Sequence, residues 1–272
     1  MSLPFARPLP FHRSLLSQTG LSVIALCLAA CSPVTRRGLE PLVTDRPDFT
    51  ESTETVPQGM RQLEAGTTFG NQLAEESASL GESLLRIGTS AHTELRVALN
   101  SYAYSRSGGQ TVQGFEDVTL GTKIKLMSGG GDGSLKPALA VIVGSTIPTG
   151  GPRVTAGRFQ PEVKFGLAWD LTSRVAFSSN LNYAHITDET GTHGEYAATG
   201  SLGVGLTEHV ASYAEYYTFQ PVGTWLPSTH YFNGGLTFGF TDNLQLDVRS
   251  GLGLHRIAGP DYFLGLGISR RW

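Results

Sequence analysis

The sequence has no uninterrupted apolar run of about 18 residues after position 30, which excludes a bundle of membrane-spanning helices. Charged residues are few, at 16 % of the chain, and the net charge of −3 argues against a nucleic-acid partner, because binding to phosphates needs a basic surface. Cysteine is nearly absent. Both copies, Cys27 and Cys31, lie near the N-terminus, so no internal disulfide is expected.

Patterns typical of catalysis and metal binding are missing too. The histidines are scattered without the spacing of metal ligands. No serine has a base beside it that the strand periodicity supports. The glycine run Gly129–Gly133 lacks the Lys-Ser/Thr of a phosphate-binding loop and therefore indicates a turn. We predict no catalytic residue, no metal site and no cofactor, and we expect that the protein is not an enzyme.

What the sequence does contain is glycine, with 34 copies, and segments in which large apolar side chains alternate with small or polar ones. In the terminal segment, Tyr262, Leu264, Leu266, Ile268 and Trp272 alternate with Gly265, Gly267, Ser269 and Arg271. Successive strand side chains point to opposite faces, so the first set would face lipid and the second the lumen. This pattern is typical of the closing strand of an outer-membrane β-barrel.

The same alternation recurs along the chain. The earlier segments that show it are Gln62–Phe69, Ser83–Thr89, Glu94–Tyr104, Val118–Leu126, Leu135–Ile147, Pro161–Leu171, Val175–Tyr183, Tyr196–Leu206, Val210–Phe219, His230–Phe240 and Leu244–Leu254. The mean hydropathy of −0.07 agrees, because lipid-facing and lumen-facing residues cancel in any window. The prediction is an all-β fold, an antiparallel transmembrane β-barrel of about twelve strands over residues 61–272, in the bacterial outer membrane.

Connection lengths support this topology. Short turns are expected near Ser90–Thr93, Asp170–Arg174, Thr207–His209 and Thr241–Asn243 on the periplasmic side. Longer connections are expected on the other side, at Gly70–Glu82, Ser105–Glu116, Pro148–Gly157, Ile186–His193, Gln220–Pro227 and His255–Pro260. Barrels of this type alternate short and long ends in this way. The glycine-rich connection Ser128–Ser134 departs from the pattern, since it is long on the short side.

The N-terminus has the plan of a bacterial secretory signal. A basic start is followed by an apolar stretch and by small residues before Cys31, which predicts a signal peptide over residues 1–30. Leu28–Cys31 resembles the lipobox of lipoproteins, in which the cysteine is lipidated and becomes the first residue of the mature chain. The alternative is an ordinary signal that is cleaved nearby, with Cys31 incidental.

Charged residues of both signs fall on the inward phase of the predicted strands. They are Glu64, Arg86, Glu94, Arg96, Lys123, Lys125, Glu162, Lys164, Glu215, Asp247 and Arg249. Lining a lumen, they could set a solute preference as charged rings do in pores. Alternatively they could pair across neighbouring strands, for example Glu162 with Lys123 or Asp247 with Arg249, and fill the interior. The tyrosines and the tryptophans Trp169, Trp225 and Trp272 indicate interfacial girdles more than an aromatic-solute site.

Residues 31–60 precede the first strand and lack its periodicity. Within them Asp45, Arg46, Asp48 and Glu51 form a short charged stretch beside Pro47, a residue that restricts the backbone. This stretch could fold into the barrel mouth as a plug or gate, where inward charges offer partners of opposite sign. The alternative is a periplasmic lead-in whose charges are simply solvated.

The letters TDRPDFTEST, followed by VPQGMRQLEAG, resemble the start of outer-membrane transporters of the family named after the MetA pathway of phenol degradation. The likeness extends more loosely to the terminal DYFLGLGISRRW. It implies a transporter-like barrel, which we expect to be a passive channel for small solutes, hydrophobic or aromatic ones included. Its expected partners are lipid, solute and, through the strand ending at Trp272, the barrel-assembly machinery. A non-conducting structural or adhesin-like barrel is the alternative.

Overall fold

Antiparallel strands account for most of the chain in the computed structural model, which describes residues 41–72, 75–188, 191–254 and 260–272. The strands are β1 (Arg61–Gln72), β2 (Glu75–Gly88), β3 (Thr93–Ser107), β4 (Gln110–Phe115), β5 (Val118–Met127), β6 (Ala138–Ile147), β7 (Gln160–Thr172), β8 (Val175–Asp188), β9 (Gly191–Gly205), β10 (Val210–Val222), β11 (Thr229–Thr241), β12 (Leu244–Gly253) and β13 (Tyr262–Arg271). The predicted signal peptide and Cys31 lie outside the described residues.

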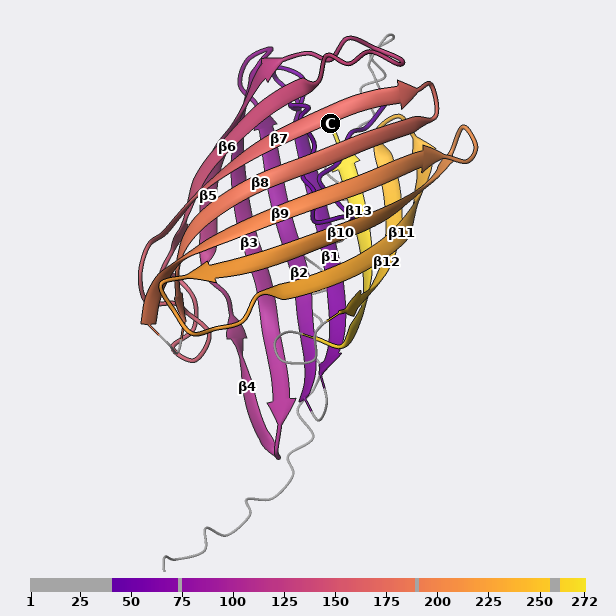
Figure 1. Cartoon of the computed structure of the whole chain (residues 1–272). Coiled ribbons are helices and arrows are strands. Elements are labelled where there is room, and N and C mark those ends of the chain that lie inside the picture. The colour runs from indigo at the N-terminus through magenta and orange to yellow at the C-terminus, as the bar shows by residue number, and fades with distance from the viewer. Residues whose placement is uncertain (1–40, 73–74, 189–190, 255–259) are drawn as a thin grey trace, which may run out of the picture. The chain divides into compact units, whose positions relative to one another are not determined.

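The strands close into a ring, as Figure 1 shows. Apart from β4 and β5, each strand pairs with its neighbour in sequence, and β1 pairs with β13 to complete the barrel. Both β4 and β5 pair with β3, one along each half of it, so together they fill a single position in the ring. The barrel therefore has twelve positions, and the predicted fold class is confirmed.

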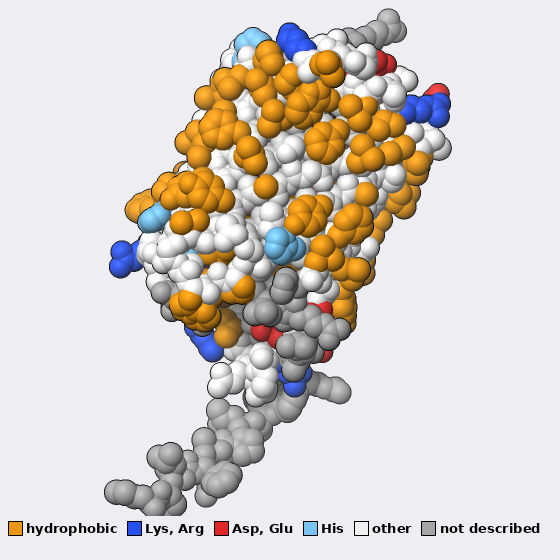
Figure 2. All heavy atoms as spheres, in the orientation of Figure 1, with side chains coloured by type: hydrophobic (Ala, Val, Ile, Leu, Met, Phe, Trp, Pro, Cys, Tyr) orange, Lys and Arg blue, Asp and Glu red, His pale blue; other side chains and the backbone are white. Residues whose placement is uncertain are grey.

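The alternation along the strands sorts the side chains as predicted. Leu264 and Leu266 are about half exposed on the outside of β13, whereas Phe263, Ser269 and Arg271, which have the opposite phase, are buried. Figure 2 shows hydrophobic side chains spread over the strands of the visible face. Among the described residues no helix is long and apolar enough to cross a membrane. The strands provide the apolar surface that an outer-membrane protein presents to lipid.

The strands are longer than the alternation alone predicts. Three connections expected to be long, at 70–82, 105–116 and 186–193, lie largely within the strand pairs β1–β2, β3–β4 and β8–β9, and β10 takes in residues 220–222 of a fourth. A strand that extends beyond the membrane is wetted on both faces, so it loses the apolar alternation while keeping its ladder of hydrogen bonds. We call the end of the barrel that carries these extensions the outer end.

The wall is irregular where β2 meets β3. The pairing register shifts on both sides of Ser83, and Gly81 has a φ of 77°, a conformation that glycine adopts without steric cost. On β3, Asn100 has a φ of 35°. The gap between β4 and β5, at Glu116 and Asp117, lies next to this stretch, because Glu116 donates its backbone N–H to the Ser101 carbonyl.

Candidate functional site

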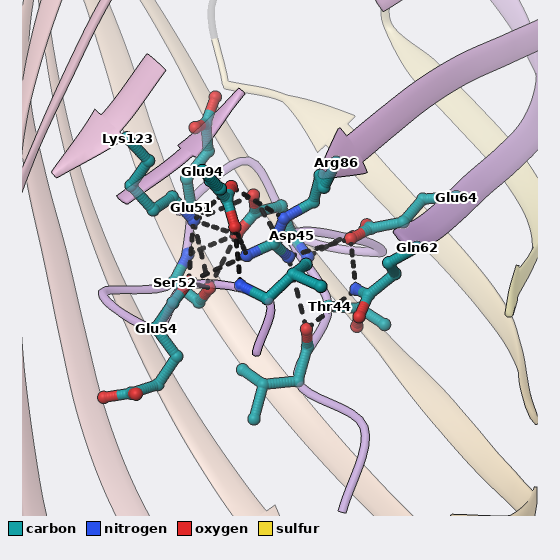
Figure 3. Close-up of polar contacts among 12 residues, drawn as sticks. Thr44, Asp45, Glu51, Ser52, Glu54, Gln62, Glu64, Arg86, Glu94 and Lys123 are labelled. Carbon is teal, nitrogen blue, oxygen red and sulfur yellow. Dashed lines mark hydrogen bonds and ion pairs between the residues drawn. The ribbon is translucent and has the colours of Figure 1, made fainter. Parts of the chain in front are cut away.

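Residues 41–60, here the N-terminal segment, lie inside the barrel before β1 begins. Their polar groups bond to side chains on the inner faces of β1, β2, β3, β5, β7, β9, β10 and β12. Figure 3 shows the segment crossing the lumen, with side chains from the wall pointing toward it. Strands that are distant in sequence are thus joined through one short stretch of chain.

Asp45 is the centre of these contacts. Its carboxylate oxygens lie 2.9 Å from Lys123 Nζ, 2.5 Å from an Arg96 nitrogen and 3.4 Å from an Arg86 nitrogen. Burial by itself would raise the pKa of Asp45, but the charges of Arg86, Lys123 and Arg96 outweigh it and hold that pKa well below its usual range. Asp45 therefore carries its negative charge inside the barrel.

The wall residues around Asp45 form a buried ionic network (Figure 3). Arg86 donates to Glu94 at 2.8 Å and to Glu64 at 2.9 Å, and these three side chains and Lys123 are at most 1 % exposed. The N-terminal segment completes the network, since the backbone N–H of Asp45 donates to Glu64 and that of Val56 to Glu94. Buried charges are tolerated only when partnered in this way.

Glu51 makes a second anchor and shares Arg96 with Asp45. One carboxylate oxygen accepts from Arg96 at 2.9 Å and the other from Lys164 at 2.7 Å. Burial opposes ionisation, yet the positive charges of Arg96 and Lys164 lower the pKa of Glu51 from its ordinary value of 4.5 to about 2. Nearby, Glu54 pairs with Lys125 at 2.5 Å, where the Glu54 side chain is 42 % exposed.

Arg46 reaches in a third direction. It lies 2.8 Å from Glu82 and 3.4 Å from Asp247. The guanidinium lies against Gly66 of β1 and Gly267 of β13, so that a methyl group on either glycine would collide with it. Glycine at these two inward positions therefore makes the space that Arg46 occupies.

Glu215 binds the segment from β10. Its Oε2 accepts from the Phe49 N–H at 2.9 Å and from the Asn233 amide at 2.7 Å, while its Oε1 accepts from the Thr50 N–H at 2.6 Å. Burial, together with the charge of Glu215, raises the pKa of Asp48 well above its usual range. Asp48 is the one acidic residue of the predicted stretch whose ionised form the site disfavours.

The structure places the predicted lumen residues on the inner face of the barrel. Glu64, Arg96, Lys123, Glu215 and Asp247 are buried. The pairs differ from those suggested by neighbouring strands. Glu162 lies 3.4 Å from Lys164, and Arg249 donates to the Pro47 carbonyl at 2.9 Å and lies 3.6 Å from Glu82. Ion pairs predicted from neighbouring strands are wrong here because the N-terminal segment binds the same charged side chains.

Sequence reasoning missed Glu82 and Asn233 as site residues. Glu82 falls in a stretch expected to be a loop. Asn233 lies on the inward phase of its strand, but nothing near it in the sequence indicates its partner Glu215. The expectation that the tyrosines form interfacial girdles also fails for two of them. Tyr217 and Tyr231 are 8 % and 7 % exposed and face the interior, not a membrane interface. Their inward phase was the available signal.

Two cavities lie between the segment and the outer end. One of about 550 Å³ is lined by Asn100, Asp117 and the 153–156 loop, and one of about 360 Å³ extends from Asn100 to Arg46 and Glu64. They share Asn100 and Glu116, so the second continues the first inward. Asp117 holds the rim by accepting from the Gly150 and Ala156 N–H groups at 2.8 and 2.9 Å. The open space thus ends at the N-terminal segment.

A family model described as "Putative MetA-pathway of phenol degradation" matches residues 44–272. The chain belongs to this family. The matched region takes in the N-terminal segment from Thr44 as well as every strand, so the family model covers the segment together with the barrel that surrounds it.

Solved structures similar to this one are outer-membrane channels and porins. An outer membrane channel from Pseudomonas putida F1 has a TM-score of 0.62 and 15 % identity, covering 81 % of this chain and 98 % of that one. The NanC porin has a TM-score of 0.53 and 8 % identity, covering 77 % and 98 %. At such identities the likeness is one of fold. No curated protein sequence matches the chain.

Proposed function

We propose that this protein is a passive channel of the bacterial outer membrane for small solutes, and that residues 44–56 plug it. The observation that carries the proposal is the location of the segment at the inner end of the two cavities, where it bonds to opposite walls of the barrel. The fold and the family place the protein among outer-membrane barrels of channel type.

The plug is held by charge, which makes it displaceable. Nearly every contact that anchors it is an ion pair or a hydrogen bond, and these can be exchanged for water when the lumen is hydrated. An apolar plug would expose apolar surface to water on leaving, which costs free energy, whereas Asp45, Arg46 and Glu51 would regain their hydration. Solute class follows the family description, which points to aromatic compounds such as phenols.

Single-channel conductance in planar bilayers tests the proposal. The mature chain is compared with one that lacks residues 32–55, and the heat-dependent mobility of each on gels verifies that the barrel has folded. Larger or more frequent steps after truncation are expected. Equal steps from both proteins would discard the plug but keep the channel. Silence from both folded proteins would overturn the channel.

A closed structural barrel is the second candidate, favoured by the burial of Glu64, Arg86, Glu94 and Lys123 in one partnered network. It predicts that neither the mature chain nor the truncated one conducts. Enzymatic function is not proposed, because the anchoring groups are engaged with each other and no substrate-facing base is assigned.

Further proposals concern the environment of the barrel. The apolar exterior would contact lipid, and the barrel-assembly machinery would recognise the strand ending at Trp272. We also propose signal cleavage before Cys31 with lipidation of that cysteine. Mass spectrometry of the mature N-terminus tests it, since a diacylglyceryl-modified Cys31 supports the proposal and an unmodified start elsewhere overturns it.

A further inference from the structure

Aromatic side chains form an apolar patch on one side of an otherwise charged lumen. Tyr217 of β10 stacks on Tyr231 of β11 with ring centroids 4.9 Å apart, and Phe219 meets Tyr231 edge-on at 6.2 Å. Phe263 of β13 lies beside them and is 7 % exposed, like its neighbours in the cluster. Four wall residues thus make a pocket for a flat ring, here called the aromatic cage: Tyr217, Phe219, Tyr231 and Phe263.

Phe49 of the plug fills this cage. Its ring stacks on Tyr217 at 4.9 Å with the planes 25° apart, and it meets Phe219 edge-on at 5.2 Å. Offset stacks and edge-on contacts are the two preferred arrangements of aromatic pairs, so the cage is shaped for a ring, not for an aliphatic chain. The ring of Phe49 is the one part of the plug that is held by aromatic packing.

Polar donors lie directly beside that ring. The backbone N–H groups of Phe49 and Thr50 and the Thr50 hydroxyl all donate to Glu215, at 2.9, 2.6 and 2.5 Å. Glu215 is 1 % exposed while the plug is seated, so withdrawal of the plug frees the hydrogen-bonding positions that residues 49 and 50 occupy on its carboxylate. This part of the wall therefore fits an aromatic ring that has a hydrogen-bond donor beside it.

We propose that the aromatic cage and Glu215 form a binding site for aromatic solutes that carry a hydroxyl or amino group, and that Phe49–Thr50 is an internal stand-in for such a solute. The inference rests on the proposed channel function and names the site in the lumen at which its solute would compete with the plug. A solute of this kind and the plug compete for one site. Binding of the solute therefore shifts the population toward the displaced plug.

Competition makes Phe49 an inhibitor of its own channel. Removing its ring frees the cage without touching the wall residues, and it leaves only the hydrogen bonds of residues 49 and 50 to Glu215 for the solute to displace. Solute affinity should then rise, because the solute no longer has to displace a packed ring. Removing a cage ring should do the opposite, because the stacking partner itself is lost.

The test is a ¹⁹F NMR titration of 4-fluorophenol with the full mature chain in detergent, with empty micelles subtracted. F49A is expected to bind the probe about tenfold more tightly than the unaltered protein. In the F49A background, Y217L is expected to weaken binding about fivefold to tenfold. Y216L serves as the matched control, since Tyr216 is adjacent but 43 % exposed on the outer face. It should leave binding unchanged.

Two further probes separate the parts of the site. Fluorobenzene lacks the donor and 4-fluorocyclohexanol lacks the aromatic ring, so each should bind F49A at least fivefold more weakly than 4-fluorophenol does. Equal affinity of all three probes, or equal affinity of F49A and the unaltered protein, would overturn the inference. Gel mobility confirms folding of every variant.

The outcome is distinguishable from failure of the channel itself. If the truncated protein conducts while F49A gains no affinity, the channel stands and the solute site falls. If F49A gains affinity while the truncated protein is silent, the site stands as a binding site in a barrel that does not conduct.

Discussion

Lys123 and Asp45 are 78 residues apart in the chain, yet Lys123 Nζ lies 2.9 Å from Asp45 Oδ1 at the centre of the barrel. The two side chains are 0 % and 4 % exposed. One belongs to a membrane-spanning strand and the other to the segment that precedes all the strands. Their contact therefore anchors the proposed plug, and it suggests where to disturb that plug selectively.

Substituting D45N should unseat the plug. The change leaves Lys123, Arg86 and Arg96 short of a buried counter-charge, and breaking a buried ion pair typically costs about 3 kcal/mol, or roughly a hundredfold in the docking equilibrium. Open probability in planar bilayers is expected to rise accordingly. The matched control is E54Q, because Glu54 belongs to the same segment but its ion pair with Lys125 is exposed. Equal effects of D45N and E54Q would contradict this prediction.

Acid should open the channel through Glu51. Its pKa falls from 4.5 to about 2 when the plug is docked, so the undocked plug binds protons more readily than the docked one. The contribution of Glu51 to docking is complete above pH 4.5 and is lost as the pH falls toward 2. Open probability should therefore rise over that range. At neutral pH the variant E51Q should be more open than the unaltered protein, and the two should converge near pH 2. Parallel pH profiles would refute the assignment.

The substitution D48N should lower the open probability, which is the opposite of the effect expected for D45N. Burial and the charge of Glu215 raise the pKa of Asp48 in the docked plug, so docking is weakened as the pH rises through that value. A neutral side chain of the same size removes this cost. We expect D48N to lower the open probability at neutral pH, with the difference shrinking as the solution becomes acidic. A variant that is more open than the unaltered protein would show that Asp48 anchors the plug.

Substituting D117A should loosen the outer rim without unseating the plug. Asp117 accepts from the backbone of Gly150 and Ala156, and these bonds pin the loop that carries Arg153. Limited proteolysis with trypsin should cut after Arg153 several-fold faster in D117A. The exposed residue Asp132, changed to alanine, is the control and should leave the rate unchanged. An unchanged rate in D117A would show that the loop is held by other contacts.

The sequence predicts the barrel well because alternation is a local property. In β13 each lipid-facing leucine is two residues from the next, and that spacing is the pleat itself. Strand ends are less predictable. The stretch around Glu82 lies beyond the apolar alternation, yet β2 continues through it because its backbone pairs with β1 and β3.

Charges were predictable as a set and not as pairs. The phase of β7 shows that Lys164 faces inward, but nothing near it in sequence indicates Glu51, which lies 113 residues away. The same holds for Phe49 and Tyr217, whose stacking depends on how the segment turns inside the lumen.

By itself, the sequence determined the fold class, the number of positions in the ring and the face on which each strand residue lies, because these follow from a period of two and from the solvent on each side. Only the tertiary structure decided that residues 44–56 cross the lumen and which wall charge each of them meets. Closing the ring brings β3, β7, β10 and β12 around one interior, and distances across that interior have no counterpart in local spacing.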